Sequence, residues 1–247
     1  MKDGIGSHPF AGAIRFALGD RVMDAAFADR AIHLPESDAL VLADLHLGRG
    51  ASANVELPLS ESDVPSRLAE LCERFSPTEV VLAGDVLHSF DRLPDGVRET
   101  FHHVERTVEQ AGARLIVTPG NHDTLLDAVW DGPTADEHRV GKTVVCHGHA
   151  LPDTAAERYV VGHDHPAIRI EGQRRPCYLV GRSAAVAAEV VVLPSFTKLA
   201  PGVVVNQLGA LDSPLVTDLD EFRPVVRDED ADETLEFPPL GTFRELL

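Results

Sequence analysis

The sequence of 247 residues predicts an α/β fold in which two mixed β-sheets face each other between helices, a four-layer α/β/β/α sandwich in one domain. The first half alternates apolar strand-like runs with amphipathic helical segments, and this order favours parallel strands joined by right-handed crossovers. The second half holds short apolar runs with little helix between them, which favours a second sheet of mixed or antiparallel strands. A chain of this length can bury a core between two such sheets.

The first half opens with a predicted hairpin and continues with three buried strands. In residues 11–34, Gly19 and Asp20 separate two apolar runs, which is a turn signal. Each later strand is a short apolar run that ends in polar residues. These runs are ALVLAD (39–44), EVVLAGD (79–85) and RLIVTPGNHD (114–123).

Two amphipathic helices separate these strands. Residues 62–75 begin with a capping residue at Ser62 or Asp63, carry Pro65 in the first turn and then repeat apolar residues at helical spacing. Residues 97–111 place apolar side chains on one helical face, and a glycine follows as a stop signal. Strand, helix, strand, helix, strand is therefore the expected order.

The second half is rich in strands. Helix-length segments are scarce, and the best candidate spans residues 124–130. The acidic run at 227–236 is expected to be exposed and solvated, and the apolar segment after it is expected to dock onto the body. The predicted strands lie in KTVVCHG, RYVVGH, AIRIEG, PCYLVG, AEVVVLP and PGVVVNQ.

The charge composition is strongly acidic. The net charge is -18, from 40 acidic and 22 basic residues, and only Lys2, Lys142 and Lys198 are lysines. At molar salt the Debye length is about 3 Å, so crowded carboxylates repel one another weakly. The composition therefore predicts a halophilic archaeon with a salty cytoplasm as the host. In such a protein general acidity can hide a basic face, so net charge does not exclude a nucleic-acid substrate.

The remaining composition favours a cytoplasmic protein. Cys72, Cys146 and Cys177 are scattered without a CxxC pair, which argues against a disulfide framework and fits a reducing compartment. No run approaches the roughly 18 apolar residues of a membrane span. The first residues, MKDGIGSHPF, lack the apolar region of a secretory signal.

Polar clusters follow the predicted strands at five places. Because ligands of open α/β sheets bind beyond the carboxyl ends of the strands, these clusters are expected to meet in one region. Carboxylates, imidazoles and an amide oxygen suit manganese, iron or zinc, and the isolated cysteines build no thiolate site. The clusters are Asp44 with His46, Asp85, Asn121 to Asp123, His147 with His149, and His163 with His165.

The spacing within the clusters suits two ions. Asp44 and His46 stand two positions apart, so on an extended segment both would lie on one side and hold one ion. His163 and His165 repeat this spacing. Asp85 has two oxygens with which to bridge two ions. Ions about 3.5–4 Å apart can deprotonate a bridging water and hold both the attacking and the leaving oxygen.

The motifs DxH, GD, GNHD, HG and GHxH occur in this order within residues 39–166, and together they resemble the signature of the calcineurin-like phosphoesterase superfamily. The resemblance implies a binuclear phosphoesterase. His122 would protonate the leaving oxygen or stabilise the charged phosphoryl group, and Asp123 would hold its imidazole. The implied ligands are Asp44, His46, Asp85 and His165 for the first metal, and Asp85, Asn121, His147 and His163 for the second.

Three segments resemble a subgroup, the SbcD-related archaeal phosphoesterases and bacterial PdeM endonucleases. They are VLADLHLG (41–48), GDVLH (84–88) and VVLPSFTKLAPGVVVN (191–206). The resemblance implies a manganese-dependent phosphodiesterase, a nuclease or nucleotide phosphodiesterase acting on DNA, with a DNA-repair helicase or ligase as a possible partner. His163 follows His147 by 16 positions, an interval shorter than in the repair nucleases proper.

Several alternatives stay open. The reaction could instead be that of a small-molecule phosphomonoesterase or cyclic-nucleotide phosphodiesterase, and a non-catalytic metal-binding scaffold is a second alternative. His88 either contacts substrate phosphate or is a loop residue. His149 is expected to be structural and Cys146 to lie in the core, while Arg182 and Lys198 are single cations that could meet phosphate. The sequence leaves the oligomeric state open.

Overall fold

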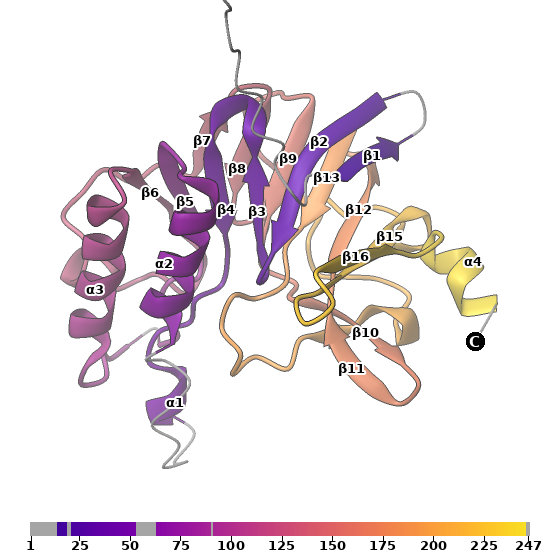
Figure 1. Ribbon diagram of the computed structural model, residues 1–247. Helices are drawn as coiled ribbons and strands as arrows, with labels where there is room; N and C mark the ends of the chain where they lie inside the picture. The colour runs from indigo at the N-terminus through magenta and orange to yellow at the C-terminus, as the bar shows by residue number, and fades with distance from the viewer. Residues whose placement is uncertain (1–13, 19–20, 53–62, 90, 246–247) are drawn as a thin grey trace, which may run out of the picture.

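The computed structural model describes residues 14–18, 21–52, 63–89 and 91–245. Within these ranges the strands form a six-stranded, a seven-stranded and a three-stranded sheet, and the two large sheets face each other (Figure 1). The predicted mixed α/β sandwich is confirmed.

The first sheet changes from antiparallel to parallel pairing along its width. Neighbouring strands from β1 to β4 run antiparallel, and β4, β5 and β6 are parallel. Helices α2 (Val64–Phe75) and α3 (Val97–Gln110) pack on its outer face, while the short α1 (Arg49–Ser52) follows β4 (Figure 1). In sequence order the strands are β1 (Ile14–Leu18), β2 (Arg21–Ala28), β3 (Ala31–Leu34), β4 (Ala39–Leu42), β5 (Glu79–Ala83) and β6 (Arg114–Thr118).

The second sheet also mixes strand directions. Strands β8, β9 and β13 are parallel, and the outer strands pair antiparallel. Its spatial order is β16 (Glu233–Glu236), β15 (Arg223–Asp228), β12 (Tyr178–Ser183), β13 (Ala188–Val192), β9 (Arg158–Val161), β8 (Thr143–Cys146) and β7 (Glu137–Val140).

The outer layer on the second sheet contains less helix than the layer on the first. Buried side chains from the 3₁₀ turns η3 (Val205–Gln207) and η4 (Leu219–Glu221) and from helix α4 (Leu240–Glu245) pack on it. The small sheet of β11 (Gln173–Pro176), β10 (Pro166–Ile170) and β14 (Val203–Val204) lies at the lower edge in Figure 1.

A layer of buried apolar side chains joins the two large sheets. It combines Phe27, Val41 and Val81 of the first sheet with side chains of the second that include Val145 and Val191. Burial of this kind stabilises a fold by about 25 cal/mol per Å² of apolar surface removed from water. The interface therefore holds the carboxyl ends of the parallel strands of both sheets in one place.

Most predicted elements of the first half are confirmed. The three buried strands, the two helices and their parallel order occur where expected, and β1 pairs with β2 as a hairpin. The turn residues Gly19 and Asp20 lie outside the described residues. The predicted helix at 124–130 is wrong, because the chain forms only the 3₁₀ turn η2 (Leu126–Ala128). Gly132 and Pro133 follow closely, and neither residue supports a longer helix.

The two predictions for the C-terminal part of the chain are confirmed. The acidic run is exposed, and part of it forms a hairpin of β15 and β16, in which Arg227 pairs with Glu229 and Asp232. The last segment docks, with Leu240 and Phe243 buried. Across the described ranges, no helix has the length and apolar character that a membrane crossing demands.

Candidate metal centre

The polar clusters converge at the carboxyl ends of five parallel strands. Asp44 and His46 follow β4, Asp85 follows β5, and Asn121 follows β6, all in the first sheet. The second sheet supplies His147 after β8, and His163 and His165 after β9. The edge at which the two sheets meet thus gathers donor side chains that lie up to 121 positions apart in the sequence.

The first group combines Asp44, His46, Asp85 and His165. One donor atom from each lies within 4.8 Å of all the others. His46 Nε2 lies 3.1 Å from His165 Nε2, and His165 Nε2 lies 3.3 Å from Asp44 Oδ1. Two imidazole nitrogens that face each other with carboxylate oxygens beside them form a donor set that suits a divalent cation.

A second group shares Asp85 with the first. His147 Nε2 lies 3.3 Å from Asp85 Oδ1, 3.1 Å from Asn121 Oδ1 and 3.2 Å from His163 Nδ1. The other Asp85 oxygen, Oδ2, lies 3.8 Å from His46 Nε2 in the first group. The carboxylate of Asp85 therefore stands between two donor sets, with one oxygen toward each.

The backbone at these positions is left-handed rather than extended. Asp44, His46, Asp85, His163 and His165 have φ values of 58°, 46°, 48°, 73° and 47°. The prediction that the paired residues share one side of an extended segment is therefore wrong. Left-handed backbone costs non-glycine residues about 1–3 kcal/mol each and is concentrated at functional sites. Left-handed residues after β4, β5 and β9, rather than extended strand geometry, therefore direct the side chains at these positions.

The motif glycines leave room for the ligands. A Cβ added to Gly120 would lie 2.2 Å from Asp85 Oδ1 and 2.3 Å from the Asp85 backbone nitrogen. One added to Gly84 would lie 2.4 Å from His147 Nδ1. Real Cβ atoms do not approach other heavy atoms this closely. The glycines of GD and GNHD are thus required for space beside the donor atoms.

The protein environment disfavours positive charge on the imidazoles of His46 and His147. Burial lowers the pKa of His46 to about 3 and that of His147 to about 4. Burial, with the charge of Asp44, raises the pKa of Asp85 to about 7. For His165, burial lowers the pKa, but the carboxylate of Asp44 outweighs it and the pKa is raised.

These shifts fit a cation at the centre. Neutral imidazoles have lone pairs with which to bind a cation. The raised pKa of Asp85 beside the carboxylate of Asp44 indicates that no positive charge of the protein fully compensates the two. A divalent ion would supply that charge and favour the ionised form of Asp85, because bound cations are usually the largest local charges in such a site. The residues present therefore fit one or two divalent ions.

A segment far along the chain supports Asp44 from behind. Ser195 Oγ donates to the Asp44 carbonyl at 2.7 Å, and the Phe196 amide donates to the Ala43 carbonyl at 2.8 Å. Arg67 of α2 donates to the Phe196 carbonyl at 2.8 Å, and its guanidinium lies 4.1 Å from the centre of the Phe196 ring. Sequence reasoning missed this support, although PSFT stood in the segment compared with the subgroup.

His122 and Asp123 make contacts different from those predicted. The Asp123 carboxylate accepts hydrogen bonds from the amides of Gly120 at 2.8 Å, Leu87 at 2.8 Å and Val86 at 3.2 Å. The orienting contact expected from Asp123 is made instead by the His88 carbonyl, 3.2 Å from His122 Nδ1. By accepting from these amides, the carboxylate of Asp123 ties the loops after β5 and β6 together.

Other candidates lie around the centre. His88 stacks parallel to His122 at a ring distance of 6.2 Å, and His46, His88 and His122 can also bring three nitrogens within 4.8 Å. Burial first, and the nearby charge of Arg49 second, lower the pKa of His88. Arg49 was not predicted, although it directly follows the DLHLG motif.

The remaining residues named from the sequence lie in four different parts of the structure. The exposed His149 lies with its ring 5.3 Å from His147, and Cys146 is buried in the outer core of the second sheet. Arg182 is exposed on β12 and donates to the Ala187 carbonyl. Lys198 lies in the segment that supports Asp44, and it pairs with Asp63 at 3.4 Å.

Comparisons with known proteins found a family and a similar fold. The sequence model of the family described as calcineurin-like phosphoesterase matches residues 38–167, slightly more than half of the chain. No curated protein matches the sequence. Among solved structures, the chain is similar to a nuclease named MPE from Pseudomonas putida, with a TM-score of 0.60 and 21% identity. The match covers 87% of this chain and 96% of that one, and at this identity it shows a shared fold.

Proposed function

The chain belongs to the calcineurin-like phosphoesterase family, and we propose that it is a two-metal phosphodiesterase that cleaves DNA or another nucleotide-based diester. Membership makes it a metal-dependent phosphoesterase hydrolase. The observation that carries the proposal of two metals is the position of Asp85, whose two oxygens face two separate donor groups. A single domain is part of the proposal, because residues from both large sheets line the site.

We assign the donor side chains to two ions. Asp85 would bridge the ions, and the neutral imidazoles would hold them without adding positive charge. When bound, the ions would supply an activated water and neutralise charge on the phosphoryl oxygens. The first ion would be held by Asp44, His46, Asp85 and His165, and the second by Asp85, Asn121, His147 and His163.

His122 is proposed as the acid that serves the leaving group. Its Nδ1 contacts the His88 carbonyl, so Nδ1–H donates there and Nε2 faces the centre, 3.8 Å from Asp85 Oδ2. The side chain is 26% exposed, so a substrate can reach it. A protonated Nε2 at this place can donate to the leaving oxygen or to a phosphoryl oxygen. Asp123 then has a supporting role, because it holds the loop that carries His122.

The metal assignment is tested by anomalous diffraction from crystals soaked in manganese, the ion we expect, with iron and zinc as alternatives. Two peaks about 4 Å apart on either side of Asp85 are expected. A single peak away from Asp85 would exclude the bridging role.

The diester preference rests on two lines of support. The motifs around Asp44 and Asp85 resemble those of nuclease-like members, and a solved nuclease has a similar fold. The test compares bis-p-nitrophenyl phosphate with p-nitrophenyl phosphate in manganese and adds labelled single-stranded DNA in molar salt. Faster diester hydrolysis with DNA cleavage is expected. A monoester preference with intact DNA would favour the small-molecule phosphatase. The net charge of -18 is consistent with that alternative, because an acidic protein repels a polyanion such as DNA.

A further inference from the structure

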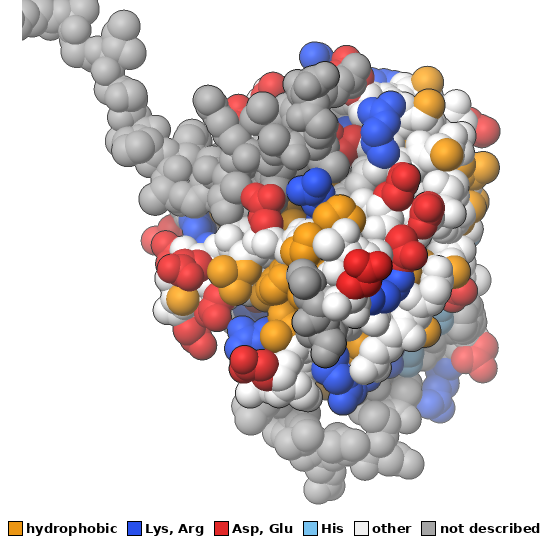
Figure 2. Space-filling view, turned by 90° about the vertical axis from the view of Figure 1, so that its right-hand side faces the viewer, with side chains coloured by type: hydrophobic (Ala, Val, Ile, Leu, Met, Phe, Trp, Pro, Cys, Tyr) orange, Lys and Arg blue, Asp and Glu red, His pale blue; other side chains and the backbone are white. Residues whose placement is uncertain are grey.

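A hollow of about 180 Å³ opens directly beside the metal centre. His165 lines it on one side, and the cations Arg30, Arg174 and Lys198 line it on the others, with no carboxylate among its described lining residues. The chain as a whole has 40 acidic and 22 basic residues, so a hollow whose charged lining residues are all basic is unusual here. Figure 2 shows Lys and Arg side chains among Asp and Glu over this face of the molecule, down to its lower part, the level at which β10 and β11 lie in Figure 1.

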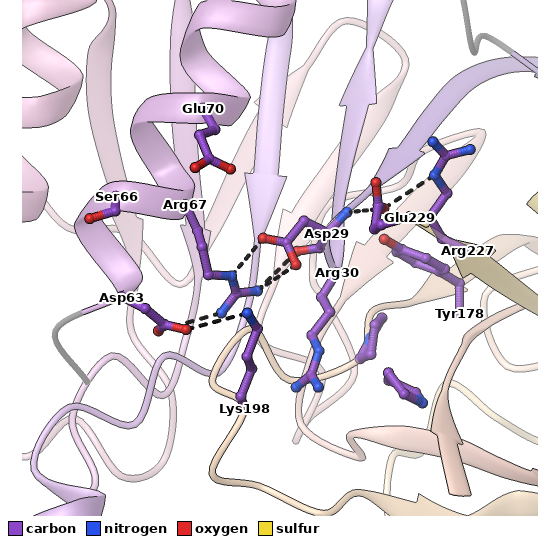
Figure 3. Close-up of a pocket in the computed structure, with 12 residues that line it drawn as sticks. Asp29, Arg30, Asp63, Ser66, Arg67, Glu70, Tyr178, Lys198, Arg227 and Glu229 are labelled. Carbon is purple, nitrogen blue, oxygen red and sulfur yellow. Dashed lines mark hydrogen bonds and ion pairs between the residues drawn. The ribbon is translucent and has the colours of Figure 1, made fainter. Parts of the chain in front are cut away.

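Arg30 provides a charge that the protein does not neutralise by direct pairing. Its NH1 donates to the carbonyls of Ser195 at 3.1 Å and Thr197 at 2.6 Å. Within the part of the chain that is described, it forms no ion pair, and Figure 3 shows its guanidinium directed away from the carboxylates of Asp29 and Glu229. Burial, followed by the charge of Arg67, lowers the pKa of Arg30. An anion bound beside Arg30 would therefore stabilise its charged form.

Arg174 approaches from the small sheet. It lies on β11, and its NH1 makes only long contacts, 3.4 Å each, with the carbonyls of Pro201 and Gly202. That backbone lies against the centre, because the Val203 amide donates to the His165 carbonyl at 2.9 Å. The guanidinium of Arg174 is therefore held loosely, with donors to spare, close to a proposed metal ligand.

The neighbouring residue on β11 has a different partner. Arg175 lies 3.3 Å from Asp228 of β15, because alternate side chains of a strand point to opposite faces. Arg174 and Arg175 thus carry the same charge one position apart, but only Arg174 lines the hollow.

The hollow continues into a wider one of about 580 Å³ that shares Arg30 and Lys198 with it. There two of the arginines are paired, as the dashed lines of Figure 3 show for Arg67 with Asp29 and for Arg227 with Glu229. Lys198 stands at the junction, 52% exposed and paired with Asp63 on its outer side. Of the three cations that line the inner hollow, Arg30 and Arg174 form no ion pair with any described residue.

We propose that the inner hollow, which we name the phosphate subsite, binds the phosphate adjacent to the scissile one in a polynucleotide strand. This inference rests on the proposed nucleic-acid phosphodiesterase function. Two guanidinium groups with free donors suit a phosphate diester, whose oxygens accept charge-assisted hydrogen bonds. The subsite gives an acidic protein a local means of holding a polyanion next to its catalytic centre.

The test uses the full-length protein loaded with manganese and the variants Arg174→Gln and Lys198→Gln. Inhibition of bis-p-nitrophenyl phosphate hydrolysis is measured with oligothymidylates of increasing length, starting from the dinucleoside monophosphate, which has a single phosphate. For each variant the inhibition constant of a longer oligomer is divided by that of the dinucleoside, so a general loss of activity cancels.

In the wild type, longer oligomers are expected to inhibit much more strongly than the dinucleoside. In Arg174→Gln and in Lys198→Gln, the improvement in inhibition constant from the dinucleoside to the longer oligomer should be about tenfold smaller than in the wild type. Tenfold corresponds to the loss of one hydrogen bond to a charged group. Arg175→Gln is the matched control and should keep the whole gain. Equal ratios in Arg174→Gln, Lys198→Gln and Arg175→Gln, or no gain with length in the wild type, would overturn the subsite.

Analysis of the oligomer products separates this inference from the proposed function. Oligomers that inhibit with the expected dependence on Arg174 and Lys198 but stay uncut would support the subsite and reject DNA cleavage. Oligomers that are cut with equal ratios in all variants would support the proposed function and reject the subsite.

Discussion

Replacement of Gly120 by alanine tests whether the glycine of GNHD exists to make room for Asp85. The new Cβ would lie 2.2 Å from Asp85 Oδ1 and 2.3 Å from the Asp85 amide nitrogen. The carboxylate could rotate away, but the backbone nitrogen could not, so Asp85 and its loop must move by about 1 Å to restore a normal contact. A misplacement of about 1 Å at a catalytic centre can cost about a hundredfold in rate.

The variant should also be less stable. Overpacking at a rigid contact costs about 1–3 kcal/mol. A change of 1 kcal/mol shifts the melting temperature of a domain of about 150–250 residues by about 2–4 °C. Gly209→Ala is the control, because a Cβ there has no heavy atom within 4 Å.

The assay compares hydrolysis of bis-p-nitrophenyl phosphate and bound manganese in both variants. Gly120→Ala is expected to lose about a hundredfold in turnover and to bind manganese more weakly, while Gly209→Ala behaves as the wild type. If Gly120→Ala hydrolyses the diester within about threefold of the wild-type rate, the steric argument is wrong.

Three further predictions concern the acid, the ions and the solvent. His122→Ala should reduce turnover about a hundredfold or more with unchanged metal content, measured by elemental analysis, and a metal-free variant would make His122 a ligand instead. Manganese at about 100 times its dissociation constant should stabilise the protein by about 2.7 kcal/mol, which raises the melting temperature by about 5–11 °C, and chelation should reverse the shift. The melting temperature should rise between dilute buffer and molar salt, because screening weakens repulsion among the 40 carboxylates, and a flat or falling curve would contradict the predicted halophilic origin.

The donor residues could be found from the sequence because each follows an apolar run that forms a buried strand. Asp44, Asp85 and His147 come directly after such runs, and parallel strands bring their carboxyl ends to one edge. The periodicity of apolar residues was also sufficient to predict helices α2 and α3, because their buried residues recur at helical spacing. These features depend on neighbours within a few residues, which a pattern in the sequence records.

The geometry within the site could not be found in this way. The spacing of Asp44 and His46 was compatible with an extended segment, but the chain reverses through left-handed residues there. Asp123 was expected to hold His122, yet its carboxylate is taken by amides of Val86 and Leu87 on a different loop. Such choices follow from which loops the packed sheets bring side by side.

The sequence alone determined the fold class, the family resemblance and the donor residues, because hydrophobic periodicity and short polar motifs are local properties of the chain. Only the tertiary structure decided that Ser195 supports Asp44 across 151 positions, and that Arg30 and Arg174 meet beside His165. These contacts depend on how the two sheets and the small sheet pack against one another. That packing is set by many weak apolar contacts acting together, and no single motif encodes it.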